Sequence, residues 1–208
     1  MVNASNTTKY SMAFTTGSLF LSESIIIAKE YVGNSDWATV RSHVIGENLL
    51  KCRTESSSKK ITGEIIKRLK FLSEDELKFI VEASTDEQAW MLWIGICKCY
   101  GFINDFADEV IREKYLTLYS DVSMSDYDNF FNKKADWHDE LDKLSVSSRS
   151  KLRQVVFKML RQVGLLNKEN QIQPVLLTGT FVRSAIKKSR EYLSVFPISD
   201  SQIKDYVL

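Results

Sequence analysis

The sequence predicts an all-α fold of many helices, with two helix-turn-helix-like units and at most one short β-hairpin wing in its C-terminal half. The 208 residues include only two prolines and eight glycines, the residues that helix interiors tolerate least. Apolar residues recur at spacings of three and four, the period of an amphipathic helix. We expect an N-terminal helical subdomain (1–119) with a basic helix-turn-helix-like unit, and a C-terminal, winged-helix-like subdomain (120–208).

Six helices are expected in the first half, over residues 18–31, 35–46, 57–71, 74–83, 87–100 and 102–116. Ser35 is the expected cap of the second helix, and the serine run 56–58 supplies the cap of the third. Ser73 and Thr85 each begin a capping-box pattern, with Glu76 and Gln88 three residues later. Helix 87–100 is apolar on nearly every side, so it is predicted to be the buried centre of the fold.

The second half continues the helical pattern. Residues 120–142 are acidic and aromatic, and we expect a helix and a loop there. A strongly amphipathic helix should run from Ser148 to Val163, capped by Ser147 or Ser148 and ended by Gly164. The following run GLLNKENQIQPVLL has two short apolar stretches around a polar turn, the order of elements in a winged helix. A basic helix over 180–193 and a terminal helix or tail over 199–208 complete the prediction.

Charge is distributed unevenly, although the net charge is only +1. Residues 72–142 hold seventeen acidic and six basic residues, whereas residues 147–168 hold six basic residues and no acidic one. Residues 183–190 add four more bases. This layout indicates basic patches that face a polyanion, carried beside an acidic surface. The alternative is that the basic and acidic blocks pair with each other across the fold.

Residues 48–70 form the strongest candidate site, with seven basic and two acidic residues. Lysine and arginine contact phosphates, hydroxyl groups hydrogen-bond them, and the first turn of a helix adds its free amides. Few side chains on the expected outer faces suit base reading, Gln154 and Arg161 being exceptions, so we expect salt-sensitive binding of double-stranded DNA with little sequence preference. The predicted contact residues are Lys51, Arg53, Thr54, Ser56, Ser57, Ser58, Lys59, Lys60, Lys67, Arg149, Lys151, Gln154, Lys158 and Arg161.

Catalytic chemistry finds little support in the sequence. The two histidines, His43 and His138, are more simply read as packed or surface residues. Ser56-x-x-Lys59 and Ser57-x-x-Lys60 match a serine–lysine hydrolase pattern, but the companion motifs are absent from the sequence. We therefore predict a protein that is not an enzyme, with no catalytic residue and no cofactor.

A metal site is not expected either. Asp105, Asp108 and Glu109 share one helix face, which suits a solvated surface or a docking face for a basic partner better than a divalent ion. Cys97 and Cys99 lack the spacing and the nearby histidines of a zinc site. Three cysteines, no secretory signal and no apolar run long enough for a bilayer together predict a cytoplasmic protein without a membrane partner.

Four stretches resemble the BrxA family, the small core protein of type 1 bacteriophage exclusion (BREX) systems. They are YSMAFTTGSLFLSES (10–24), NLLKCRTESSSKKITGEIIKRLKFLSEDEL (48–77), WMLWIGICKCYGFINDFADEVIREKYL (90–116) and SRSKLRQVVFKMLRQVGLL (148–166). The resemblance implies an all-helical protein with helix-turn-helix-like units, non-specific binding of double-stranded DNA, and a role in phage defence beside a DNA methyltransferase and other BREX proteins. It supplies no catalytic residues.

Two alternatives stay open. The acidic middle of the chain could dock a basic protein, making the chain an adaptor of the defence complex. The family's likeness to a helical antitermination factor keeps RNA open as a ligand. We expect the chain alone to be monomeric.

Overall fold

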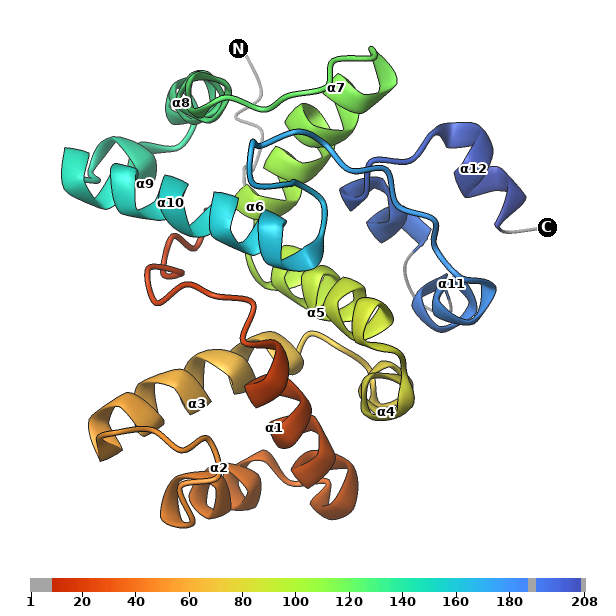
Figure 1. The fold of residues 1–208 in the computed structure, drawn as a ribbon. Helices are drawn as coiled ribbons and strands as arrows, with labels where there is room; N and C mark the ends of the chain where they lie inside the picture. The colour runs from red at the N-terminus through yellow and green to blue at the C-terminus, as the bar shows by residue number, and fades with distance from the viewer. Residues whose placement is uncertain (1–8, 187–189, 207–208) are drawn as a thin grey trace, which may run out of the picture.

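The computed structural model describes residues 9–186 and 190–206, and in these ranges the chain is built from helices (Figure 1). They are α1 (Leu21–Asn34), α2 (Trp37–Gly46), α3 (Glu55–Leu69), α4 (Glu74–Glu82), α5 (Thr85–Cys99), α6 (Gly101–Phe106), α7 (Glu113–Leu116), α8 (Met124–Ala135), α9 (Asp139–Asp142), α10 (Val146–Val163), α11 (Gly179–Ile186) and α12 (Asp200–Asp205). A π-helical stretch, η1 (Ala107–Arg112), joins α6 to α7, and η2 (Arg190–Val195) is a 3₁₀ helix. The all-α prediction is confirmed.

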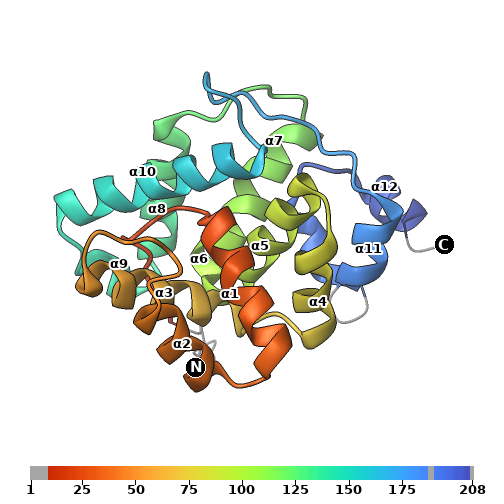
Figure 2. The same cartoon turned by 60° about the horizontal axis from the view of Figure 1, so that its bottom comes forward.

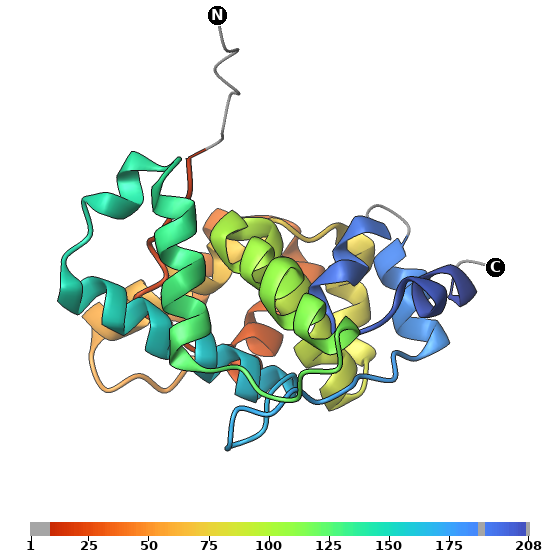
Figure 3. The ribbon, with the colours of Figure 1, turned by 90° about the horizontal axis from the view of Figure 1, so that it is seen from above.

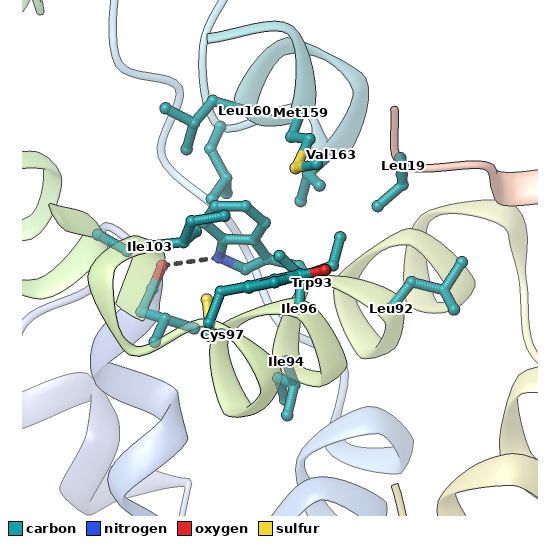
Figure 4. Packing of buried hydrophobic residues seen from close by; sticks show 14 of the residues in the cluster. Leu19, Leu92, Trp93, Ile94, Ile96, Cys97, Ile103, Met159, Leu160 and Val163 are labelled. Atoms are coloured by element: carbon teal, nitrogen blue, oxygen red, sulfur yellow. Dashed lines mark hydrogen bonds between the residues drawn. The ribbon is translucent and has the colours of Figure 1, made fainter. Parts of the chain in front are cut away.

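Helix α5 is the centre of the molecule, as its apolar sequence predicted. It packs against α1, α3, α4, α10, α11 and η2, and Figure 2 shows α1 and α4 lying over it. Trp93 is fully buried, and its indole N–H donates to the carbonyl of Val195 at 3.2 Å. Figure 4 shows Leu160 and Val163 of α10 close to this indole. Burial of so large a side chain stabilises the fold by about 2–3 kcal/mol.

A second group of buried side chains joins α6 to α8 and α10. The ring of Phe102 lies edge-on to Phe130 and Phe131, with centroid distances of 5.2 and 5.7 Å. The ring centroids of Phe106 and of Phe157 on α10 are 6.4 Å apart. The buried core therefore continues across the boundary expected near residue 120, and Figure 3 shows α8, α9 and α10 together at one end of the molecule.

Helix starts follow the predicted chemistry but often use a neighbouring residue. The capping box of Ser73 and Glu76 is present. Helix α5 is instead capped by Ser84 with Glu87, and α2 by Asp36. Each correction is small because adjacent hydroxyl and carboxylate residues can all accept the free amides of a first turn. Which one does so depends on how the following helix packs.

The predicted wing is reduced to a minimal turn. Gly164 ends α10 in the left-handed conformation at φ 85°, as predicted. Leu166 and Ile172 then form one isolated antiparallel bridge, and the described ranges contain no β-sheet. The basic helix expected over 180–193 is split: α11 ends at Ile186, residues 187–189 lie outside the described residues, and η2 follows.

Candidate nucleic-acid interface

The loop between α2 and α3 holds two of the predicted basic residues in fixed positions. Asn48 clamps this loop, because its side-chain oxygen accepts from the amide of Cys52 at 2.9 Å and its side-chain nitrogen donates to the carbonyl of Cys52 at 3.1 Å. Asn48 and Lys51 both adopt the left-handed backbone conformation, with φ of 46° and 51°. Lys51 and Arg53 are exposed on this turn.

The first turns of α3 present hydroxyl groups and lysines to solvent. Thr54, rather than a serine of the run 56–58, caps the helix and accepts from the amide of Ser57 at 3.2 Å. Ser56, Lys59 and Lys60 are exposed. The partial positive charge of a helix N-terminus adds to these side chains.

Lys59 also forms a local ion pair. Its ammonium contacts the Glu55 carboxylate at 2.5 Å, one turn earlier on the same helix. The hydrogen bond from Lys59 lowers the pKa of Glu55. Glu55 thus reduces the net positive charge at this end of α3, where Lys60 has no ion pair with another described residue.

Ser58 corrects the predicted contact list. Its side chain is buried, on the same helix face as Thr62, Ile65 and Leu69. A hydroxyl on this face cannot reach a phosphate at the surface. The burial of Ser58 was predictable from the helical period, because position 58 lies seven residues, or about two turns, before Ile65.

Lys67 lies further along α3 and is half-buried. Its ammonium sits 4.6 Å from the centroid of the Tyr100 ring and 3.5 Å from the Ser11 hydroxyl. Beneath it, Glu64 accepts hydrogen bonds from Arg68 and from the Tyr100 hydroxyl. Burial and this bond to Glu64 raise the pKa of Tyr100. Lys67 thus belongs partly to the packing of α3.

The predicted residues on α10 divide into two groups. Lys151, Gln154 and Lys158 are exposed and follow one face at spacings of three and four. Arg149 and Arg161 have structural contacts instead. Arg149 donates to the carbonyls of Leu141, Asp142 and Leu144, and Arg161 donates to the Asn170 side chain at 2.7 Å.

The ion pairs of the acidic residues within 72–142 are mostly with basic residues of the same segment. Lys134 bridges Asp105 and Glu109, Lys98 pairs with Glu76, and Lys114 pairs with Asp126. Within the described residues, the pairs between this block and the basic segment 147–168 are Arg149 with Asp142 and Arg153 with Asp128. Lys151 and Lys158 form no ion pair in the same ranges. The alternative in which the blocks pair across the fold therefore accounts for little of the basic surface.

The starts of α3 and α10 lie toward the same end of the molecule. In Figures 1 and 3 the starts of α3 and α10 are both on the left, and residues 9–20 run between the two helices. This connecting segment is fixed to α10, since the amide of Leu19 donates to the Gln162 side chain at 2.8 Å.

The described residues offer little for catalysis or metal binding. The Nδ1 atom of His43 lies 2.8 Å from the Glu30 carboxylate at the surface. His138 is buried and stacks on Tyr10, with ring centroids 4.0 Å apart. In the same ranges no hydrogen bond joins Ser56 to Lys59. No group of three or more histidine, cysteine or carboxylate residues among them could hold a metal ion. None of the helices described has the length and apolarity needed to cross a bilayer.

Comparison with known proteins agrees with this fold. The chain is 24% identical over 163 residues to the BREX protein BrxA of Escherichia coli O9:H4 (strain HS), covering 77% of this chain and 76% of that one. It is 25% identical over 130 residues to the BREX protein BrxA of Bacillus cereus (strain H3081.97), covering 62% and 65% of the two chains. An uncharacterized protein from Magnetospirillum magneticum has a similar crystal structure, with a TM-score of 0.79 at 20% identity, covering 92% of this chain and all of that one. The BrxA family model matches residues 8–189, and the chain therefore belongs to the BrxA family.

Proposed function

We propose that this chain is a component of a BREX phage-defence system that binds double-stranded DNA and is not an enzyme. Two curated relatives that carry the name BREX protein BrxA support the placement in that system. The DNA-binding part rests on one observation: among the described residues, the exposed lysines of α3 and α10 form no ion pairs with the acidic residues within 72–142. We further propose that the chain acts in the cytoplasm, as a monomer when alone.

The arrangement of these side chains suits contacts to DNA phosphates more than contacts to nucleobases. Lys51, Arg53 and Lys60 surround the start of α3, where hydroxyl groups and free amides are also available. Lys151 and Lys158 offer a second set along α10. Of the two side chains with a potential for base reading, Arg161 is bonded to Asn170, which leaves Gln154. Binding with little sequence preference follows from this composition.

Anisotropy of a labelled duplex of about 20 base pairs tests the proposal. Affinity should fall by several orders of magnitude between about 50 and about 200 mM salt, and should change little when the sequence is shuffled. The double variant Lys151→Gln, Lys158→Gln should bind more weakly at every salt concentration, while Lys78→Gln, which removes one exposed positive charge from α4, should bind as the unaltered protein does. Absence of binding at the lowest salt would remove the proposal. A structured RNA that competes better than the duplex would favour the antitermination-like alternative.

A second candidate function is an adaptor that docks a basic segment of another BREX protein, such as the methyltransferase. A groove of about 430 Å³ between η1 and α8 supports it, since Glu109, Glu113 and Asp126 line it beside one base, Lys133. Capture of partners from cells carrying the whole defence operon tests this reading. Glu113→Lys should abolish capture and leave duplex binding unchanged; retention of capture would remove the adaptor.

A further inference from the structure

A groove between α2 and the C-terminal half of α3 lies outside the contact residues predicted from sequence, apart from Lys67. It has a volume of about 510 Å³, within the range of small-ligand sites. Trp37 and Phe71 line it together with Arg41, Gly63, Lys67 and Lys70. It therefore combines aromatic rings with three basic side chains, and no carboxylate is among its lining residues.

The aromatic side chains are placed for stacking. Trp37 packs face to face on Tyr31, with ring centroids 3.9 Å apart and an interplanar angle of 18°. This contact holds the indole in a fixed orientation from one side. Phe71 follows the end of α3 and is 48% exposed, so its ring is open to a partner.

The basic side chains of the groove differ in their freedom. The ammonium of Lys67 is directed at Tyr100. The guanidinium of Arg41 lies over Gly63, with one nitrogen 3.0 Å from the place where a Cβ would stand. The absence of a side chain at Gly63 thus lets Arg41 lie against α3. Arg41 and Lys70 are exposed, and they are the bases best placed to meet an anion.

This groove continues the basic face of α3. Lys59, Gly63, Lys67 and Lys70 follow one another at spacings of four, four and three, so they lie on one helical stripe. A strand whose phosphates contact the start of α3 would be led along this stripe into the groove. An acidic peptide would also fit the charge, and the competition experiment below separates it from a DNA strand.

We propose that the groove binds unpaired nucleotides of a DNA strand, with bases stacked on Trp37 and Phe71 and phosphates on Arg41 and Lys70. The inference rests on the proposed function for the path of the strand along α3. Stacking on aromatic rings accepts any base, because every base has a π-face, so this site also has little sequence preference.

The test compares a blunt duplex with the same duplex carrying a single-stranded extension of about five thymidines, using the full chain and anisotropy. The extension should increase affinity about tenfold, the size expected when a base stacks on a protein ring. Phe71→Ala and Lys70→Gln should each bring the ratio of the two affinities close to one. Trp137→Ala, which removes another exposed aromatic ring, and Lys78→Gln should leave the ratio unchanged.

The outcomes separate the inference from the proposed function. Equal affinity for both DNAs in the unaltered protein overturns the inference alone, as does an advantage that survives Phe71→Ala and Lys70→Gln. Binding of the extended DNA without binding of the blunt duplex supports the groove and overturns the duplex proposal. A glutamate-rich peptide containing phenylalanine serves as a competitor. If it binds in a Phe71-dependent way while the extension gives no advantage, the groove belongs to a protein partner and the inference is wrong.

Discussion

The side chain of Val155 occupies the space that a Cβ atom at Gly17 would need. An ideal Cβ there would stand 2.7 Å from the Cβ of Val155 and closer still to its methyl groups. Val155 is buried on α10, while Gly17 belongs to the segment that runs between α10 and α3. Close approach of backbone to side chain thus fixes this segment against α10.

Gly17→Ala should therefore lower the free energy of unfolding by about 1–3 kcal/mol, the usual cost of overpacking. Urea unfolding followed by circular dichroism measures it. Gly33→Ala is the matched control, because nothing lies within 4 Å of that position. Its stability should be equal or slightly higher, by at most about 1 kcal/mol. Equal effects of the two substitutions would show that the contact does not constrain the fold.

Glu87 should give the protein an acid-sensitive component of stability. Its carboxylate accepts from Thr178, from Thr180 at 2.9 Å and from the Ser84 amide at 3.1 Å, joining the starts of α5 and α11. The Thr178 hydrogen bond, followed by those of Ser84 and Thr180, lowers the pKa of Glu87 from 4.5 to about 2, against the opposing effect of burial. Because the folded-state pKa is the lower one, this stabilisation is complete above about pH 4.5 and is lost as the pH falls toward 2. Its size is about 1–3 kcal/mol.

Glu87→Gln tests this assignment. The variant should be less stable at pH 7 by about 1–3 kcal/mol, and its stability should depend less on pH between about 4.5 and 2. Urea unfolding at several pH values measures both effects. Asp86→Asn, at an exposed neighbour in the same first turn, should keep the pH dependence of the unaltered protein. If the stability of Glu87→Gln falls with decreasing pH as steeply as that of the unaltered protein, the assignment is wrong.

Lys134 should contribute to the stability of the fold because it forms ion pairs with two carboxylates at once. Its ammonium lies 3.1 Å from Asp105 and 2.5 Å from Glu109, and Asp105 also accepts from the Tyr10 hydroxyl. These carboxylates raise the pKa of Lys134, although burial opposes them. Lys134→Met should cost about 1–3 kcal/mol at pH 7, less than for a fully buried pair.

The loss should shrink as the pH rises above about 10.5, because the raised pKa of Lys134 means that its contribution is complete only below that value. Chemical unfolding at pH 7 and about pH 11.5 gives the comparison. Lys133→Met changes the exposed neighbour on α8 and should alter stability little. A loss that is the same at both pH values would show that packing, not charge, explains the effect.

Salt dependence should reveal whether α3 and α10 contact the same duplex. Replacing Lys51 and Lys60 by glutamine, or Lys151 and Lys158, should reduce the slope of log affinity against log salt by about two in each case. Combining the four substitutions should reduce it by about four if both helices contact one DNA. A combined variant that behaves like either pair alone would place the duplex on one helix.

Helix positions were predictable from the sequence where an apolar row follows a capping residue. The α5 region and the Ser73 cap follow directly from that pattern. The exact cap was not predictable before α3 or α10, where several hydroxyl residues adjoin one another and packing selects Thr54 and Ser145. The π-helical stretch η1 left no recognisable signal, since its residues fit an α-helical pattern equally well.

The candidate surface was predictable only in part, for a physical reason. Exposure of Lys60 and Lys151 follows from helix phase, but the partners of Arg149 and Arg161 lie on other elements of the chain. No local pattern reports such contacts. The groove beside Trp37 was missed for the same reason, because its stacking residues come from α1, α2 and the end of α3.

The π-helical stretch has a consequence for comparing relatives of this chain. In η1 the backbone bonds span five residues rather than four, so Ala107–Arg112 accommodates an additional residue inside one long helix. At its C-terminal end, Arg112 donates to the carbonyl of Ile198 and the carboxylate of Asp200. A homologue shorter by one residue here could restore an ordinary helical turn and keep both flanking faces in register. An alignment of such distant relatives should therefore allow a gap of one residue within 107–112. With this gap, the residues of α6 and of α7 each stay aligned with their counterparts.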